Sequence, residues 1–344
     1  MLLIGILQMF MLSTPILLIT FNRPQHTRKV LERILEANPQ ELYIFQDGAR
    51  EGNHTDQTQS EAVRRVVEEL TTDYHINHPL HLHTLYESQN LGCGPGPAKA
   101  ISWFFSEVEE GIVMEDDCLA HPDFFPYCEE LLNRYRSDHH IGFINATLYD
   151  ARWHTEQGSS YGFSHYMVTG AWAAWRRTWE GFDLDLLQMK ATALKHQIYQ
   201  LTHNRQEAYW WYFALKEMQQ DTSKKSYWDF QMQIHLFMQS AITIHPAVNL
   251  ISNIGFDEHG THTLGNDGRG ERPTFPILPL THPSIIQVNE KLDAYCWAKT
   301  ESKGLFRDMV DNLYNHLLWS NGFGHWLLKQ YKRLKGSGYN VHRV

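Results

Sequence analysis

Cysteine is scarce in this sequence. The 344 residues include only Cys93, Cys118, Cys128 and Cys296. No two of them have the C-x-x-C spacing or another spacing typical of zinc ligands, which excludes a zinc site built from local cysteine motifs. So few cysteines in so long a chain also argue against a disulfide framework. We therefore expect reduced cysteines and a cytoplasmic protein.

An excess of positive charge and low-complexity sequence are missing as well. The formal net charge is −9, which argues against a nucleic-acid partner because neutralising phosphates requires basic patches. The composition is 42% hydrophobic and 20% charged, without internal repeats, as in an ordinary globular chain. This length allows one large α/β domain or two smaller ones with a substantial core.

The carboxyl-terminal segment departs from this charge balance. Residues 324–344 contain five Lys or Arg residues and no acid. The stretch HWLLKQYKRLK at 325–335 indicates a peripheral contact with an anionic membrane, on the inner face in a cytoplasmic protein. The alternative is an ordinary solvated helix end.

A secretory signal is not recognisable at the amino terminus. Residues 1–22 carry no charge, and neither a basic n-region nor a small-residue cleavage site is present. The apolar run is interrupted at residues 13–15, too early for a membrane span of about 20 residues. We expect residues 1–12 to be an apolar extension, with Met11 an alternative start, and a short membrane anchor as the competing interpretation.

Strands and helices alternate through the first half of the chain. The continuous apolar run PILLITF predicts a buried parallel strand, and Arg23-Pro24 opens a helix that Asn38-Pro39 ends. This alternation predicts an α/β fold with a mostly parallel sheet flanked by helices. The predicted strands are 15–21, 42–46, 81–86 and 111–114. The later segments are a strand at 241–245, helical patterns from about 186 to 219, and a helical tail from about 285 in which 305–319 is clearest.

Polar residues follow several of these strands directly. Arg23 follows the first, Asp47 the second, and the acidic run Glu115-Asp116-Asp117 the fourth. Ligands of open α/β sheets bind outside the carboxyl ends of the strands, so these residues are expected to converge. Adjacent carboxylates are costly to keep ionised without a cation, and Mg²⁺ or Mn²⁺ with substrate phosphates would offset them. The alternative is a solvated loop or a charge cluster at a helix start.

The acidic run and its surroundings resemble a known family. The sequence IVMEDDCLAHPDFFPY at 112–127 is similar to the metal-binding segment of the N-acetylglucosaminyltransferases that initiate complex N-glycans. It is still more similar to bacterial glycosyltransferases with the same nucleotide-diphospho-sugar transferase (GT-A) fold. The resemblance covers roughly residues 14–265. It implies that Asp117 binds the metal and Asp116 the donor, and it leaves Glu115 a structural role.

Other motifs of this family have counterparts in the chain. TFNRP at 20–24 resembles the first-strand motif, which implies nucleotide contacts for Thr20 and Arg23, and FQDG at 45–48 implies the same for Asp47. NLGCGPGP at 90–97 resembles the loop over the base, with Asn90 and Gly92. The family's basic residue has no certain counterpart there, and Lys99 is the candidate. The resemblance also places the segment from Gly170 to Trp172 near the donor sugar, and Trp172 and Trp175 are candidates for stacking on sugars, against the alternative of core packing.

An inverting transfer needs a carboxylate that takes the acceptor hydroxyl's proton. YWDF at 227–230 resembles the family's Trp-Asp motif, which implies that Asp229 is the catalytic base. The alternative is a helix cap, and Glu180 and Asp183 are the fallback bases. NLISNIGFDEHGTHT at 249–263 matches a segment of the bacterial members, in which His262 is a candidate metal ligand, ahead of His259.

These motifs predict a metal-dependent, inverting glycosyltransferase of polysaccharide biosynthesis. It would use Mn²⁺ or Mg²⁺ to move a sugar from a nucleotide-diphospho-sugar to a hydroxyl of a glycan or lipid-linked acceptor. The resemblance favours a UDP-sugar. The expected division is 13–150 for donor binding, 151–283 for acceptor binding and 284–344 for a helical tail. Two alternatives stay open: a sugar nucleotidyltransferase, although FNRPQHT replaces its Gly-rich signature, and a non-catalytic sugar-binding module.

Overall fold

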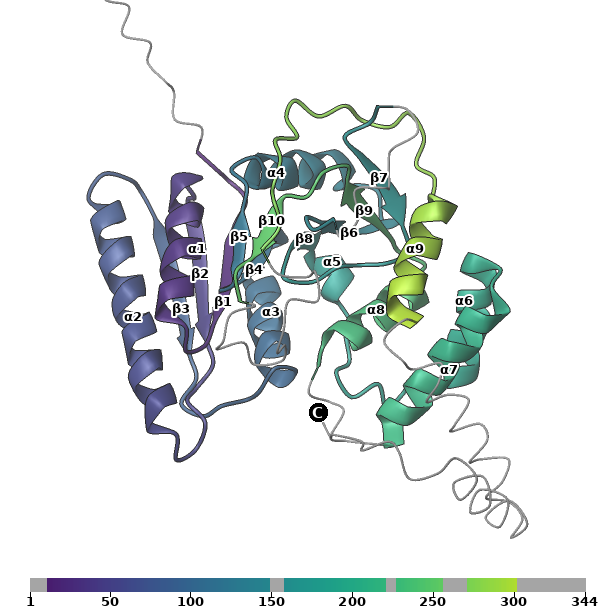
Figure 1. The fold of residues 1–344 in the computed structure, drawn as a ribbon, viewed down its shortest axis with the longest axis horizontal. Helices are drawn as coiled ribbons and strands as arrows, with labels where there is room; N and C mark the ends of the chain where they lie inside the picture. The colour runs from purple at the N-terminus through teal and green to yellow at the C-terminus, as the bar shows by residue number, and fades with distance from the viewer. Residues whose placement is uncertain (1–10, 149–157, 221–226, 256–270, 302–344) are drawn as a thin grey trace, which may run out of the picture.

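A computed structural model describes residues 11–148, 158–220, 227–255 and 271–301. An eight-stranded sheet forms its centre, with the strand order β3-β2-β1-β4-β8-β6-β9-β7 (Figure 1). The strands are β1 (Ile16–Thr20), β2 (Glu41–Gln46), β3 (His81–Tyr86), β4 (Glu110–Glu115), β6 (Ile141–Asn145), β7 (Tyr161–Ser164), β8 (Ala171–Trp175) and β9 (Ile242–Pro246). The four strands predicted in the first half are confirmed within one or two residues. The strand predicted at 241–245 is β9.

The sheet has a parallel half and a mixed half. Strands β3, β2, β1 and β4 are parallel neighbours, with Thr20 beside Gln46 and Ile19 beside Glu115. In the other half, β8 is antiparallel to both β4 and β6, whereas β6 and β9 are parallel. The predicted α/β class with a mostly parallel sheet is confirmed. The antiparallel insertion of β8 was not predicted.

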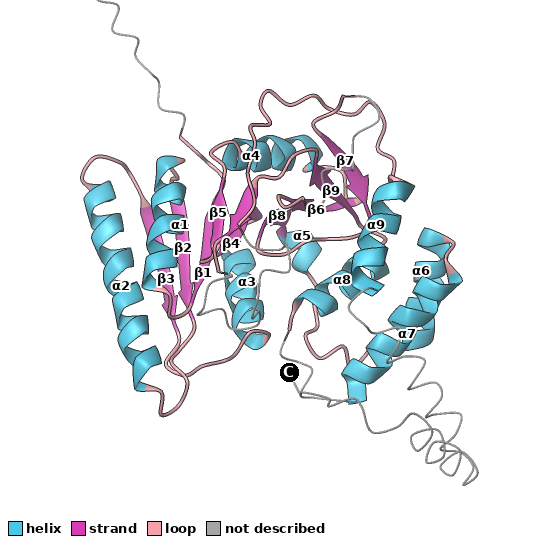
Figure 2. Cartoon of the chain, in the orientation of Figure 1, coloured by secondary structure: helices cyan, strands magenta, loops and turns pink. Residues whose placement is uncertain are grey.

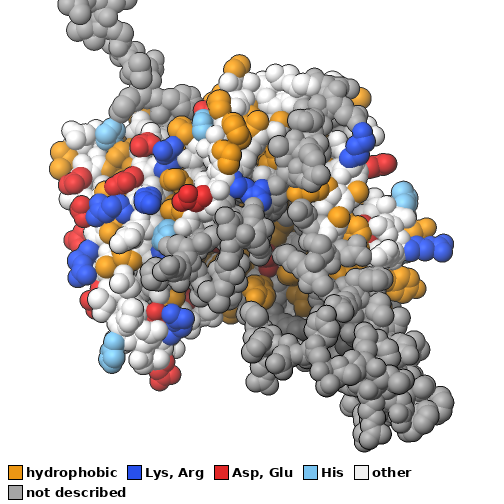
Figure 3. All heavy atoms as spheres, in the orientation of Figure 1, with side chains coloured by type: hydrophobic (Ala, Val, Ile, Leu, Met, Phe, Trp, Pro, Cys, Tyr) orange, Lys and Arg blue, Asp and Glu red, His pale blue; other side chains and the backbone are white. Residues whose placement is uncertain are grey.

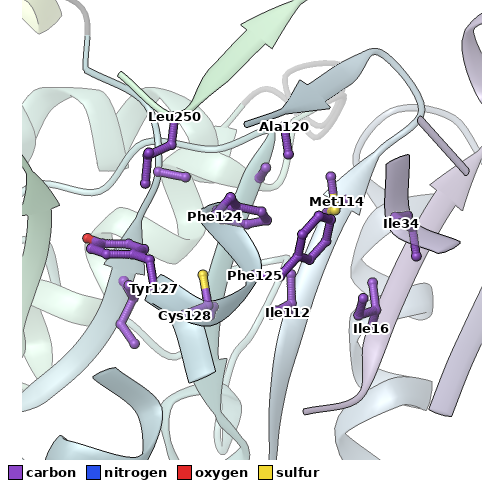
Figure 4. Packing of buried hydrophobic residues seen from close by; sticks show 14 of the residues in the cluster. Ile16, Ile34, Ile112, Met114, Ala120, Phe124, Phe125, Tyr127, Cys128 and Leu250 are labelled. Carbon is purple, nitrogen blue, oxygen red and sulfur yellow. The ribbon is translucent and has the colours of Figure 1, made fainter. Parts of the chain in front are cut away.

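Helices cover both faces of the sheet. The helices of the first half are α1 (Pro24–Glu36), α2 (His54–His75), α3 (Pro95–Glu107) and α4 (Phe124–Tyr135). Alternate residues of β1 enter different cores, because successive side chains of a strand point to opposite faces. Ile16 and Leu18 pack with residues of α1 and α4, whereas Leu17 and Ile19 pack with residues of α3. Figure 4 shows Phe125 of α4 beside Met114 of β4 in the first of these cores.

The predicted amino-terminal boundary shifts by one residue. Leu12 is only 1% exposed, and its backbone N–H donates to the carbonyl of Asn38. The chain therefore joins the fold at Leu12, inside the range assigned to the extension. Residues 1–10 lie outside the described part.

Charges of both signs cover the surface of α1 and α2. Lys or Arg side chains alternate there with Asp or Glu (Figure 3). Examples are the ion pairs of Arg28 with Glu69 and of Arg33 with Glu36.

The second half adds a helical layer (Figure 2). Its helices are α5 (Arg176–Trp179), α6 (Ala191–Thr202), α7 (Arg205–Gln220), α8 (Asp229–Met238) and α9 (Glu290–Glu301). The helical pattern from 186 to 219 becomes two packed helices, because His203 adopts φ 53° and ends α6. The predicted segment 305–319 lies outside the described residues. Within the described ranges, no helix is long and apolar enough to cross a membrane.

A small two-stranded ribbon lies beside the main sheet. Strand β5 (Cys118–Ala120) pairs antiparallel with β10 (Ile251–Asn253), so Asn253 lies opposite Cys118. This pairing brings the chain after β9 to the acidic run at the end of β4.

Candidate functional site

The carboxyl ends of β1 and β4 bring a cation and three carboxylates together. Pro24 is the first residue of α1, and Arg23 immediately precedes it without a side-chain capping bond. The Arg23 Nη1 atom donates to Asp117 Oδ2 at 2.9 Å and lies 4.0 Å from Asp116 Oδ1. The predicted convergence of Arg23 with the acidic run is therefore confirmed.

Asp116 is enclosed between the two strands. Asp116 is 7% exposed, and its Oδ2 accepts a hydrogen bond from the backbone N–H of Phe21 at 3.2 Å. Burial raises the pKa of Asp116 to about 7, although Arg23 and the Phe21 N–H act in the opposite direction. Because burial outweighs these partners, additional positive charge beside Asp116 would favour its ionised form.

Glu115, the first residue of the acidic run, interacts electrostatically with a carboxylate from the second half of the chain. Its pKa is raised to about 8, first by burial and then by repulsion from Asp117, Asp116 and Asp229, with Arg23 opposing. Asp229 therefore lies within electrostatic reach of the acidic run, although more than 100 residues separate them in sequence. The tertiary structure thus places the predicted base in the same region as the predicted donor site.

Asp229 is the first residue of α8. Its Oδ1 accepts a hydrogen bond from the backbone N–H of Phe230 at 2.9 Å. The capping alternative considered above is wrong, because Trp228 occupies the N-cap position of α8 and the helix has no side-chain capping bond. The preceding Trp228 is buried against Trp172 and Trp179, with ring centroids 5.9 and 6.1 Å apart. These aromatic contacts hold the start of α8, and thereby Asp229, at a defined position.

The second-strand aspartate shapes a loop. Asp47 is 8% exposed, and its carboxylate accepts from the backbone N–H groups of Gly48, Leu91 and Gly92 and from the Asn90 amide, at 2.8–3.0 Å. Burial raises the pKa of Asp47 despite these backbone donors. Gly92 has φ 85°, a conformation that glycine adopts without steric cost. The hydrogen bonds of Asp47 described above join it to neighbouring residues of the protein itself. Nucleotide contacts by Asp47, Asn90 and Gly92 stay predictions.

The remaining predicted donor residues lie in three different settings. Thr20 is buried, and its hydroxyl donates to the carbonyl of Phe45 at 2.9 Å. The Lys99 ammonium, on exposed α3 surface, is paired with Glu87. Gly170, with φ 105°, accepts a hydrogen bond from the Glu115 backbone N–H at 2.8 Å and therefore does border the acidic run.

The expectation that Trp172 and Trp175 stack on sugars is wrong. Trp172 is 1% exposed and Trp175 2%, because both belong to β8, which is buried on both faces. Trp172 instead stacks on Phe143, with centroids 4.6 Å apart. Of the fallback bases, Glu180 is exposed, and Asp183 accepts a hydrogen bond from the Asp185 backbone N–H.

Asn253, the last residue of β10, and Gly255 complete the surroundings of Asp117, and no sequence motif points to either of them. The Asn253 side-chain nitrogen lies 3.4 Å from Asp117 Oδ1, and Gly255 packs against the same carboxylate. Both residues lie in the segment 249–263, whose position depends on the pairing of β5 with β10. His262 and His259 of that segment lie outside the described residues.

The described ranges contain no group of three or more His, Cys, Asp or Glu side chains arranged to hold a metal ion. A cation at Asp117 would therefore take few ligands from this part of the protein. Mg²⁺ in particular is often held by one or two carboxylates, with water and substrate phosphates filling the other positions. The single partly open carboxylate of Asp117 fits such a site, and it does not fit a closed all-protein site.

The fold and this region together define an α/β protein with a cationic and acidic site at the carboxyl edge of its sheet. Comparison with known proteins gives no narrower class, because no family model and no curated protein matches the chain. Among solved structures, a UDP-glucose pyrophosphorylase complexed with UDP-glucose is 10% identical, with 49% of this chain and 78% of that chain covered and a TM-score of 0.28.

Two other solved structures are similarly distant. A 4-diphosphocytidyl-2C-methyl-D-erythritol synthase from Anaerococcus prevotii is 8% identical, covering 49% of this chain and 74% of that chain, with a TM-score of 0.29. A glucose-1-phosphate thymidylyltransferase from Bacillus anthracis is 13% identical, covering 52% and 75%, also with a TM-score of 0.29. At these values the likenesses carry no argument about function.

Proposed function

We propose that this protein is a metal-dependent, inverting glycosyltransferase that uses a nucleotide-diphospho-sugar, with a UDP-sugar favoured. The observation that carries the proposal is the contact of Arg23 with the acidic run at the carboxyl ends of β1 and β4, together with the repulsion between Asp229 and Glu115 of that run. A positive group beside carboxylates suits a diphosphate and its cation, and a further carboxylate suits proton removal from an acceptor.

The roles follow from the positions of the side chains. Asp117 would hold Mn²⁺ or Mg²⁺, which when bound offsets the charge of the leaving diphosphate. The Arg23 guanidinium, 2.9 Å from Asp117, would bind the same diphosphate and stabilise its developing charge. The Asp229 carboxylate would accept the proton of the attacking hydroxyl. The rigid start of α8 would keep this carboxylate in place during the transfer.

The acceptor is proposed from the sequence resemblance. It would be a hydroxyl of a glycan or lipid-linked sugar in polysaccharide biosynthesis, handled in the cytoplasm near the membrane surface. The contact with such a surface is assigned to residues 324–344, which lie outside the described part of the chain.

The proposal is tested by screening nucleotide-sugars for Mn²⁺-dependent donor hydrolysis and transfer. We expect Asp117→Ala to lower hydrolysis by about 100-fold or more, since even outer partners of metal ligands contribute about 10- to 100-fold. Unchanged hydrolysis by Asp117→Ala would refute the assigned metal site. Release of pyrophosphate from a nucleoside triphosphate and a sugar phosphate would instead identify a nucleotidyltransferase, and donor binding without turnover a binding module.

A further inference from the structure

The end of β10 and the residue that follows it contact Asp117 through both a backbone and a side-chain hydrogen bond. The backbone N–H of Ile254 donates to the Asp117 carbonyl at 2.8 Å. The Asn253 side-chain nitrogen lies 3.4 Å from Asp117 Oδ1, while Arg23 donates to Oδ2. Each oxygen of this carboxylate therefore has a nitrogen neighbour from a different segment of the protein.

Gly255 lies so close to Asp117 that no side chain fits there. A Cβ atom built on Gly255 would overlap Asp117 Oδ2 and would lie 2.8 Å from Asp117 Cβ and 2.9 Å from Asp117 Cγ. The φ angle of Gly255 is outside the left-handed region, so the backbone itself would accept an alanine. It is therefore the Asp117 side chain, including its Cβ atom, and not the backbone conformation, that requires glycine at this position.

The orientation of the Asn253 amide is set by its other hydrogen bond. Its Oδ1 accepts from the backbone N–H of Gly255 at 2.8 Å, which only the oxygen of the amide can do. The amide nitrogen is consequently the atom that faces Asp117. Asn253 thus joins Gly255 and Asp117 through one rigid side chain.

The first turn of α1 holds this segment from the other side. His26 Nε2 lies 2.9 Å from the carbonyl oxygen of Ile254, and because a carbonyl only accepts, this nitrogen carries the proton. Arg23, three residues earlier, contacts Asp117. The start of α1 therefore fixes both Asp117 and the segment packed against it.

We propose that Asn253 and Gly255 are positioning residues that set the orientation of the Asp117 carboxylate, so that the end of β10 forms one wall of the donor site. Neither residue is assigned direct contact with substrate. The positioning itself is a property of the folded chain, whereas its consequence for catalysis rests on the proposed function. The two parts are therefore tested by different measurements.

A double-mutant cycle in unfolding tests the positioning. Gly255→Ala is expected to lower the melting temperature in the wild-type background, because its Cβ overlaps Oδ2, Cγ and Cβ of Asp117. In an Asp117→Gly background these three atoms are gone, so the same substitution should lower the melting temperature much less. Equal shifts in the two backgrounds would overturn the inference, whether or not the protein turns over any nucleotide-sugar.

Metal dependence tests the consequence for the site. Asn253→Ala is expected to raise the Mn²⁺ concentration for half-maximal donor turnover, and the Kd for Mn²⁺ with bound nucleotide, by about 10- to 100-fold. The kcat at saturating Mn²⁺ should change less, which general damage to the fold would not produce. The matched control is Ser252→Ala, whose hydroxyl accepts from the Arg272 backbone N–H and has no contact with Asp117 among its described hydrogen bonds. Identical Mn²⁺ dependence in the two variants would overturn the assignment of Asn253.

The two tests separate the inference from the proposed function. Strong coupling between residues 255 and 117 in a protein that uses no nucleotide-sugar would refute the function and support the positioning. Donor turnover in the wild type without such coupling would refute the positioning and leave the function standing.

Discussion

Asp229 carries the most specific chemical assignment at the scale of single residues. Its carboxylate accepts a hydrogen bond from the Phe230 N–H. An ionised carboxylate has about four acceptor positions, so accepting this bond and accepting a substrate proton are compatible.

Asp229→Asn separates the hydrogen bond to Phe230 from the proposed role as base. The amide oxygen can still accept from Phe230, so we expect a folded protein that binds donor with unchanged Kd. Transfer should fall by about 10²- to 10⁴-fold, the usual contribution of a general base. Asp183→Asn is the matched control and should transfer normally. If Asp183→Asn abolishes transfer while Asp229→Asn does not, the base is Asp183.

The buried acids predict how stability depends on pH. The pKa of Glu115 rises from 4.5 to about 8 and that of Asp116 from 3.8 to about 7 on folding. At a pH between the unfolded and the folded pKa of each group, the folded state holds a proton that the unfolded chain has released. The free energy of unfolding therefore falls as pH rises from about 4 to about 8. Denaturant titrations across this range should show a smaller decrease in Glu115→Gln. An unchanged slope would contradict the raised pKa of Glu115.

At the scale of elements, the loop after β3 depends on the end of β2. Asp47 accepts three backbone N–H groups and the Asn90 amide, and so acts as the centre of the loop from Asn90 to Gly92. The sequence motifs imply separate nucleotide contacts for Asp47 and for this loop. The contact between the aspartate and the loop follows only from the structure.

Asp47→Ala should therefore destabilise the protein. Leaving buried donors without an acceptor costs about 1–3 kcal/mol each when no water replaces it, so we expect a loss of about 2–3 kcal/mol in the free energy of unfolding. Faster amide exchange at Leu91 and Gly92 should accompany this loss. Asp73→Ala, on the exposed face of α2, is the control and should stay within about 0.5 kcal/mol of wild type. Amide exchange at wild-type rates in Asp47→Ala would exclude this role.

Elements differed in how far their sequence predicted them. Strands β1, β2 and β4 are short, largely apolar runs bounded by turns, a pattern typical of buried parallel strands. Strand β3, with the sequence HLHTLY, lies at the edge of the sheet and is mostly exposed. Strand β8, with the sequence AWAAW, is buried on both faces and so shows no alternation of polar and apolar residues. Its sequence leaves both sugar stacking and core packing open for the tryptophans, because aromatic residues serve both purposes.

At the scale of the whole molecule, the basic segment at 324–344 is expected to add membrane attraction to a chain of net charge −9. Each Lys or Arg near an anionic surface contributes about 1 kcal/mol. We expect co-sedimentation with phosphatidylserine-containing liposomes at low salt, weakened by high salt and by deletion of 324–344. Neutral liposomes are the control. Binding that survives the deletion would exclude this segment as the contact.

The sequence by itself determined the alternation of strands and helices in the first half and the positions of Arg23, Asp47 and the acidic run at strand ends. These features are local, because hydrophobic periodicity and turn residues act within one element. Parallel strands joined by helices then bring their carboxyl ends to one edge.

Only the tertiary structure decided which residues from the second half of the chain lie beside the acidic run. Asp229 comes within reach of Glu115 through the packing of Trp228, and Asn253 meets Asp117 across 136 residues of sequence. The antiparallel pairings of β8 with β4 and of β10 with β5 create this proximity. Long-range pairings depend on the complete packed core, and no local pattern of residues encodes them.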